Sequence, residues 1–233
     1  MLTSPQILAL NVATVRNQIA EAARSAGRSP DDVTLIGVSK GQSASSVAEA
    51  RLAGVTHFGE NYVQEGVAKI AALPRTGLTW HFIGQLQSNK TRAVAEKFDW
   101  VHTVDRIAIA ERLSAQRAFH GPPLNVCLQV RLADEPTKGG IVPAELGHVA
   151  SVVGKLPRLA LRGLMCIPPA TREIATQRGF FSRLRQLGDT LREQGIAIDT
   201  LSMGMSADFE AAIIEGATHI RVGTAIFGPR NKP

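Results

Sequence analysis

Residues 201–228, LSMGMSADFEAAIIEGATHIRVGTAIFG, contain the pattern that decides the fold. Two short apolar runs, DTLSMG at 199–204 and HIRVG at 219–223, enclose a segment of helical composition. Short strands that alternate with helices pair in parallel through helical crossovers. The segment therefore predicts one strand–helix–strand unit of an α/β protein.

The same alternation of strands and helical segments continues along the whole chain. Eight strand candidates occur, at residues 33–39, 55–60, 79–84, 100–105, 125–132, 159–167, 199–204 and 219–223. Eight such units in 233 residues fit a single (β/α)8 TIM barrel. An open doubly wound sheet is the alternative, and it usually has fewer strands. We therefore predict an α/β fold with one closed barrel.

The beginning of the chain predicts an extra N-terminal helix. Apolar residues with helical spacing are Ile7, Leu10, Val15 and Ile19. Pro5 suits the first turn of such a helix. No turn-rich break is long enough to separate two domains. We expect residues 1–233 to form one domain, in which residues 1–30 pack on the barrel.

Composition excludes several classes of protein. With 26 Lys and Arg, 20 Asp and Glu, a net charge of +6 and 44% hydrophobic residues, the chain is not disordered. Only Cys127 and Cys166 are present, both in apolar runs, so we expect free thiols in a reducing compartment. No run approaches the roughly 18 apolar residues of a membrane helix, and the N-terminus lacks the basic start of a secretory signal. We expect a cytoplasmic protein with no membrane partner and, because aromatic residues are only 5%, no nucleic-acid partner.

Two late loops predict a phosphate site. Barrels often bind phosphate in the loops after the seventh and eighth strands. Here those loops carry the hydroxyls of Ser202, Ser206 and Thr224. Gly204 lets the backbone come close to a ligand, and Gly223 with Thr224 opens another turn. We expect Ser206 to cap a helix that opens at Ala207. Such residues also form ordinary caps and turns, so the prediction rests on their occurrence in both loops.

Lys40 follows the first expected strand, which neighbours the eighth in a closed barrel. Its amine would face the barrel mouth while its stem is sheltered, and a sheltered amine is more readily neutral. A neutral amine can form a Schiff base with a carbonyl group. The alternative is a lysine that merely extends to solvent. Beside a phosphate site, Lys40 indicates pyridoxal phosphate or a sugar-phosphate aldolase.

Two further candidates lie within expected strands. Arg221 can only donate hydrogen bonds, so facing a pyridine nitrogen it would keep that nitrogen unprotonated and weaken the ring as an electron sink. A structural ion pair is the alternative for Arg221. His81 is either a hydrogen-bonded core histidine or a cofactor-binding residue, and we include it among the candidates. Cysteines and histidines show no metal-ligand spacing, so we expect no metal.

Six stretches, in this order, make the chain similar to a known family. They are GVSK at 37–40, FGENYVQE at 58–65, WHFIGQLQSNK at 80–90, LRGLMCIP at 161–168, LSMGMSADFEAAI at 201–213 and IRVGTAIFG at 220–228. On these stretches the chain resembles the pyridoxal-phosphate homeostasis family. The resemblance implies a barrel like the N-terminal domain of alanine racemases, holding pyridoxal 5'-phosphate (PLP) as an internal aldimine.

The resemblance also implies residue roles and a function. Lys40 would attach PLP covalently, and Arg221 would face the pyridine nitrogen. The other implied cofactor-binding positions are Asn61, Met165, Ser202, Met203, Ser206, Gly223 and Thr224. The implied function is intracellular homeostasis of the vitamin B6 cofactor, and indirectly of amino and keto acids. We expect a monomer without catalytic activity, whose partners are PLP and PLP-dependent apoenzymes.

Two stretches depart from the pattern of the family. The family has a polar pair and then proline after the lysine, and it has asparagine at the end of the fifth strand. Here Gly-Gln-Ser occupies residues 41–43, and Arg131 lies near the end of the fifth strand. Arg131 would bring an extra cation toward the mouth. Both changes affect the rim rather than the lysine or the phosphate positions.

An amino-acid racemase-like enzyme with weak activity is the alternative function. Two-base racemisation needs a proton acceptor on each face of the substrate carbon. Lys40 suits one face, but the single tyrosine, Tyr62, follows the second strand and is no convincing partner for the other. With a weak electron sink at Arg221 as well, we expect a PLP carrier with little or no racemase activity.

Overall fold

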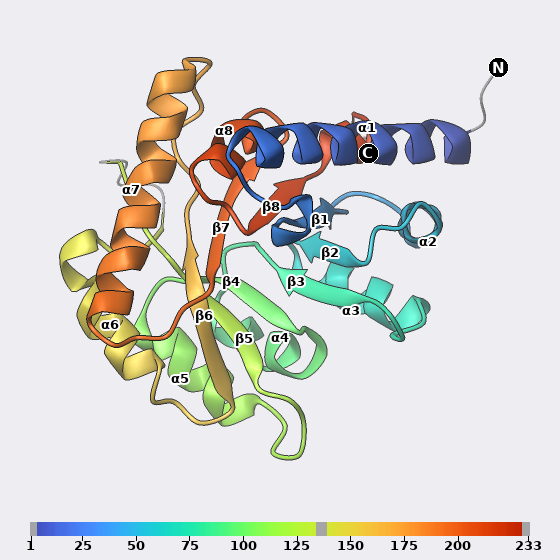
Figure 1. The fold of residues 1–233 in the computed structure, drawn as a ribbon. Coiled ribbons are helices and arrows are strands. Elements are labelled where there is room, and N and C mark those ends of the chain that lie inside the picture. Colours follow the sequence, from blue (N-terminus) through green and yellow to red (C-terminus); the bar gives the residue numbers. More distant parts are fainter. Residues whose placement is uncertain (1–3, 134–138, 230–233) are drawn as a thin grey trace.

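Eight strands close into a barrel in the computed structural model, which describes residues 4–133 and 139–229 (Figure 1). They are β1 (Thr34–Val38), β2 (His57–Glu60), β3 (Thr79–Phe82), β4 (Trp100–Val104), β5 (Leu124–Gln129), β6 (Leu159–Met165), β7 (Thr200–Met205) and β8 (His219–Val222). Neighbouring strands are parallel, and β1 pairs with β8, where Ile36 lies opposite Arg221. This closure confirms the predicted (β/α)8 barrel and excludes the open sheet.

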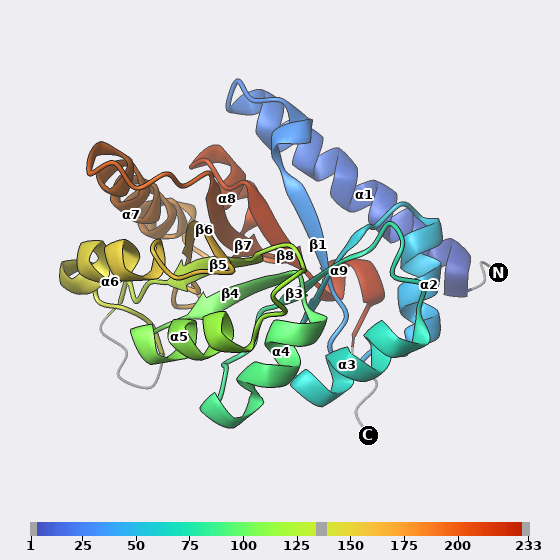
Figure 2. The ribbon, with the colours of Figure 1, turned by 90° about the horizontal axis from the view of Figure 1, so that it is seen from below.

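Helices alternate with the strands and lie around the outside of the barrel (Figures 1 and 2). They are α1 (Ser4–Ser25), α2 (Ala44–Leu52), α3 (Val63–Ala72), α4 (Thr91–Lys97), α5 (Ile107–Gln116), α6 (Leu146–Val153), α7 (Ile174–Glu193), α8 (Phe209–Ile214) and α9 (Thr224–Phe227). The alternation arises because two parallel neighbouring strands need a crossover connection, which is usually a helix. Within the described ranges, no helix is long and apolar enough to cross a membrane.

Helix α1 packs against α8, α9 and α2. Figure 1 shows α1 beside α8. The side chains that it buries are Leu8, Val12, Val15, Ile19, Ala22 and Ala23. The predicted apolar face was partly wrong, because Ile7 and Leu10 are 46% and 57% exposed. The buried residues recur every three or four positions along one stripe, and these two lie off it. Asn11 Nδ2 donates to the carbonyl of Ile226 at 3.0 Å, which joins α1 to α9.

Buried side chains fill two regions. The larger region lies between strands and helices, and its largest fully buried members include Trp80, Phe58, Phe82, Phe98 and Phe181. A smaller apolar group consists of Trp100, Cys127 and Met165. The Trp100 ring stacks on His81, which belongs to a set of buried polar side chains: His81, His102, Ser202 and Arg221. The barrel interior is therefore partly polar.

Candidate functional site

A cavity of about 390 Å³, here called the Lys40 cavity, opens where the strands end. Six predicted site residues line it: Lys40, Asn61, Ser206, Arg221, Gly223 and Thr224. The other lining residues are Val38, Gln42, Ile83, Ile167, Met205, Ala207 and Gly228. Because parallel strands bring their carboxyl ends to one face of the barrel, residues as distant in sequence as Lys40 and Thr224 meet here.

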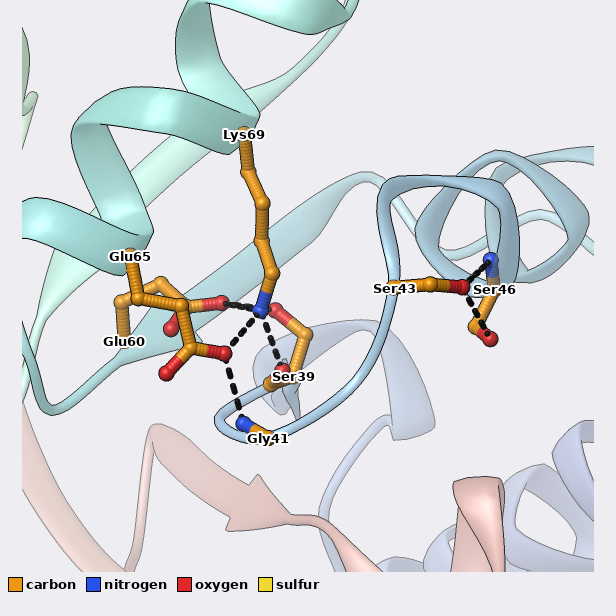
Figure 3. A network of polar contacts seen from close by, with 7 residues as sticks. All are labelled: Ser39, Gly41, Ser43, Ser46, Glu60, Glu65 and Lys69. Carbon is orange, nitrogen blue, oxygen red and sulfur yellow. Dashed lines mark hydrogen bonds and ion pairs between the residues drawn. The ribbon is translucent and has the colours of Figure 1, made fainter. Parts of the chain in front are cut away.

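Charged groups hold the backbone on both sides of Lys40 (Figure 3). From α3, Lys69 Nζ donates to the carbonyl oxygen of Ser39 at 2.5 Å and to Glu65 Oε1 at 2.6 Å. The same Glu65 oxygen accepts a hydrogen bond from the Gly41 N–H, also at 2.6 Å. The carbonyl before Lys40 and the N–H after it are thus both fixed by α3.

Glu60, at the end of β2, completes this network and is fully buried. Its Oε1 accepts from the Ser39 hydroxyl at 2.6 Å and from Lys69 Nζ at 2.7 Å. Burial raises the pKa of Glu60, whereas the hydrogen bonds from Lys69 and Ser39 oppose that rise. A carboxylate that is buried away from solvent needs such partners, because its desolvation is costly.

The loops after β7 and β8 meet at the cavity wall. The Gly223 N–H donates to the Ser206 hydroxyl oxygen at 3.3 Å. The predicted helix start at Ala207 with a Ser206 cap is wrong, because α8 begins later, at the end of a turn. In that turn Asp208 Oδ1 accepts from the Met205 N–H at 2.6 Å. The Ser206 hydroxyl therefore joins the two loops instead of capping a helix.

Arg221 presents a buried cation to the cavity, with only 4% of its surface exposed. Its Nη1 donates to the Ser202 hydroxyl at 2.7 Å, and its Nη2 donates to the Cys166 carbonyl at 2.9 Å. No carboxylate of the described residues lies within 4.0 Å of it, so the structural ion pair is not found there. Burial lowers the pKa of Arg221, yet a guanidinium stays protonated in proteins. Burying a charge is costly unless it is paired, and the partners of Arg221 are neutral. The site therefore favours a ligand that offers a hydrogen-bond acceptor to the guanidinium.

Four predicted site residues do not line the Lys40 cavity: His81, Met165, Ser202 and Met203. Ser202 lies behind Arg221 and accepts its hydrogen bond, and Met165 lies in the small apolar group of the barrel. Met203 packs in the larger core, whereas Met205 lines the cavity. The β7–β8 pairing is irregular between Ser202 and Met205, where Gly204 has a φ of 93°, so simple alternation along β7 fails there.

Asn61 has an unsatisfied buried oxygen. Among the described residues, no hydrogen-bond partner reaches its Oδ1. Buried polar atoms are almost always satisfied in folded proteins. Because Asn61 lines the cavity, a polar ligand atom would supply the missing partner.

A second cavity of about 280 Å³ adjoins the first and shares Asn61, Ile83 and Ile167 with it. Arg131 lines this second cavity and not the Lys40 cavity. Gln42, from the unusual residues after Lys40, lines the Lys40 cavity itself. These departures from the family pattern thus lie around the candidate site.

Sequence reasoning missed the network of Lys69, Glu60 and Glu65. One signal was available, since Glu65 and Lys69 are four residues apart and therefore neighbours on a helix. That spacing is common on exposed helix surfaces, so it does not indicate burial. Only the position of α3 beside the turn that follows β1 gives the pair its place next to Lys40.

Comparison with known proteins first defines a class. Residues 10–231 match the family model described as "Alanine racemase, N-terminal domain". The barrel with a lysine at the end of its first strand is thus a domain of the alanine-racemase type.

Closer relatives identify the family within this class. A pyridoxal phosphate homeostasis protein of Pseudomonas aeruginosa is 54% identical over 96% of this chain and 96% of its own. A protein of the same name from Escherichia coli K12 is 54% identical over 96% of this chain and 97% of its own. The chain belongs to the family of pyridoxal phosphate homeostasis proteins.

Solved structures of PipY from Synechococcus elongatus, 42% identical to this chain, are also similar. The structure without PLP has a TM-score of 0.85 and covers 95% of this chain and 100% of its own. The structure with PLP bound has a TM-score of 0.79 and covers 90% of this chain and 100% of its own.

Proposed function

We propose that this chain binds PLP in the Lys40 cavity and acts as a carrier of the cofactor in vitamin B6 homeostasis. The observation that carries this proposal is the meeting of Lys40, Arg221 and the Ser206–Gly223 contact in one cavity of about 390 Å³. Relatives named pyridoxal phosphate homeostasis proteins, and PipY with PLP bound, support it.

Five of the lining residues offer groups that suit PLP. When bound, PLP supplies an aldehyde, which forms a C=N bond with a neutral amine and releases water. Lys40 would supply the amine, and the hydroxyls of Ser206 and Thr224 would donate to the phosphate oxygens. Arg221 would donate to the ring nitrogen, which would then stay unprotonated. The unsatisfied oxygen of Asn61 would accept from a polar group of the ligand.

The lining of the cavity favours a carrier over a racemase. Within the described lining, no aspartate, glutamate, histidine, tyrosine or cysteine is present. Lys40 is therefore the one lining side chain there that exchanges a proton readily. Tyr62 is 64% exposed and lies outside this lining. A second proton acceptor for racemisation is thus missing from these residues.

A spectroscopic titration tests the proposal. Cofactor-free protein titrated with PLP should develop a visible absorption band that saturates at one equivalent. Lys40→Ala should lose this band, whereas Lys155→Ala, a change at an exposed lysine of the α6–β6 connection, should keep it. An unchanged band in Lys40→Ala would disprove attachment at this residue. If PLP-loaded protein converts L-alanine to D-alanine faster than the Lys40→Ala variant does, the protein is a racemase-like enzyme and the carrier function is wrong.

We further propose a compartment, an oligomeric state and recipients of PLP for this protein. Cys127 and Cys166 are free and buried, and free thiols suit a reducing compartment such as the cytoplasm. We also propose a monomer that acts as a single PLP-binding domain. PLP-dependent apoenzymes are the proposed recipients. Activation of such an apoenzyme by loaded protein, without free PLP, tests this extension.

A further inference from the structure

A row of hydrogen bonds inside the barrel ends on Arg221. His57 Nδ1 lies 2.9 Å from His81 Nε2, and His81 Nδ1 lies 2.9 Å from His102 Nε2. His102 Nδ1 lies 2.8 Å from the Ser202 hydroxyl oxygen, which accepts from Arg221 Nη1 at 2.7 Å. The five residues belong to β2, β3, β4, β7 and β8 in turn. The row, here called the histidine row, therefore follows three neighbouring strands and then crosses the interior.

Arg221 gives the histidine row a direction. A guanidinium can only donate, so the Ser202 hydroxyl oxygen accepts from Arg221. The hydrogen of the Ser202 hydroxyl is then directed to His102 Nδ1, which accepts it. His102 then carries its hydrogen on Nε2 and donates to His81 Nδ1. His81 in the same way donates from Nε2 to His57 Nδ1. The reverse direction would leave the Ser202 hydrogen without a partner among the described residues.

The surroundings keep the three rings neutral, as this arrangement requires. His81 and His102 are fully buried, and burial places the pKa of each well below its usual value. Burial also lowers the pKa of His57, although Asp99 opposes the shift. The His219 ring lies 6.1 Å from His102, and both a proton on His219 and the guanidinium of Arg221 disfavour protonation of His102 further. A neutral imidazole has one donor and one acceptor, which is what each inner position in the row needs.

We propose that the histidine row positions the Arg221 guanidinium in the Lys40 cavity, with His102 acting through the Ser202 hydroxyl. A hydroxyl that donates to His102 is a stronger acceptor for Arg221, since hydrogen bonds in a chain polarise one another. The Cys166 carbonyl holds the other end of the guanidinium. This inference rests on the proposed function, in which Arg221 faces the PLP ring. His102 and Ser202 are positioning residues, because neither lines the cavity.

The direction of the row can be tested without PLP. Nitrogen NMR of cofactor-free protein labelled at histidine distinguishes the two neutral tautomers, and single variants assign the signals. His57, His81 and His102 should all carry the hydrogen on Nε2 at neutral pH. A hydrogen on Nδ1 of His102 or His81 would overturn the direction, whether or not the protein binds PLP.

The positioning role is tested with paired variants. His102→Leu removes the acceptor for Ser202, and should weaken PLP binding about tenfold, the usual order for losing support of a charged hydrogen bond. It should also shift the pH at which the visible band of bound PLP changes. His102→Asn offers an oxygen near the position of Nδ1 and should restore both properties. His148→Leu, on the exposed face of α6, should change neither.

A double-variant cycle separates positioning from a general loss of structure. Ser202→Ala should reproduce the effects of His102→Leu, and adding His102→Leu to it should weaken PLP binding no further. Independent, additive effects would overturn the proposal, as would equal losses in His102→Leu and His102→Asn. If wild-type protein binds no PLP at Lys40, the proposed function fails, whereas the tautomer measurement still decides the row itself.

Discussion

Lys69 Nζ donates to the carbonyl oxygen of Ser39 across 2.5 Å, and so reaches the peptide unit that directly precedes Lys40. Figure 3 shows that Lys69 points from α3 toward the turn after β1, where Glu65 also holds the Gly41 N–H. The position of Lys40 is thus set by an ion network that α3 and the end of β2 supply together. This support comes from behind the cavity, since neither Lys69 nor Glu65 lines it.

Removal of the Lys69 charge should damage both the fold and the site. Lys69→Met leaves Glu60 and Glu65 without their shared cation, and breaking a buried ion pair usually costs about 3–5 kcal/mol. We expect a fall of this order in the free energy of unfolding, measured by urea denaturation. Lys155→Met is the matched control at an exposed position. Equal stability of the two variants would show that the network does not matter.

The joined loops give a second prediction. Ser206→Ala removes the hydroxyl that accepts from Gly223 and that is proposed to donate to the PLP phosphate. A hydrogen bond to a charged group contributes about 1.5–3 kcal/mol, so PLP binding should weaken by about tenfold or more. Inorganic phosphate should also compete less well with PLP in the variant. Ser182→Ala, on α7, serves as the control. Equal affinities for PLP in the two variants would contradict the proposed contact between Ser206 and the phosphate.

Gly204 supplies a test of the backbone at the end of β7. Its φ is 93°, and an added Cβ would lie 2.7 Å from Ala212 Cβ and 2.9 Å from Phe209 Cα. Gly204→Ala should therefore lower the free energy of unfolding by about 2 kcal/mol or more. Gly179→Ala should instead raise it by about 0.5–1 kcal/mol, because this glycine is in α7 with open space around it. Chemical denaturation measures the free energy of unfolding of both variants. Similar free energies for the two would contradict the strained backbone at Gly204.

The histidines inside the barrel predict sensitivity to acid. Burial lowers the pKa of His219 from 6.5 to about 4, so below pH 6.5 the unfolded chain binds a proton that the folded protein excludes. Stability should fall as the pH decreases through this window, by up to about 1.4 kcal/mol per pH unit for each such group. Above pH 6.5 this contribution should stay constant. His219→Gln should reduce the slope of unfolding free energy between pH 6.5 and 4. An unchanged slope in His219→Gln would contradict the prediction.

The strand pattern and the functional loops could be predicted from the sequence because both are local. Each strand is a short apolar run, and the carboxyl-end rule then places Lys40, Ser206 and Thr224 on one face of the barrel. Alternation along a strand is less dependable where the backbone is irregular. Met203 was predicted for the cavity, but the irregular end of β7 brings Met205 there instead.

Contacts across the barrel could not be predicted from the sequence. His102 and Ser202 are 100 residues apart and meet only because the barrel closes. The burial of Lys69 likewise depends on how α3 lies against the turn after β1, and no pattern within α3 records this. On α1 the predicted apolar face included Ile7 and Leu10, but the contacts with α8 and α9 bury the stripe that contains Leu8 and Val12 instead.

Borohydride reduction of PLP-loaded protein, followed by peptide mass mapping, tests the central claim most directly. Reduction converts a C=N bond between lysine and PLP into a stable amine, so the modified residue can be located. The added mass should appear on the peptide that contains Lys40, at one group per chain. A modification spread over other lysines, with Lys40 unmodified, would contradict the account.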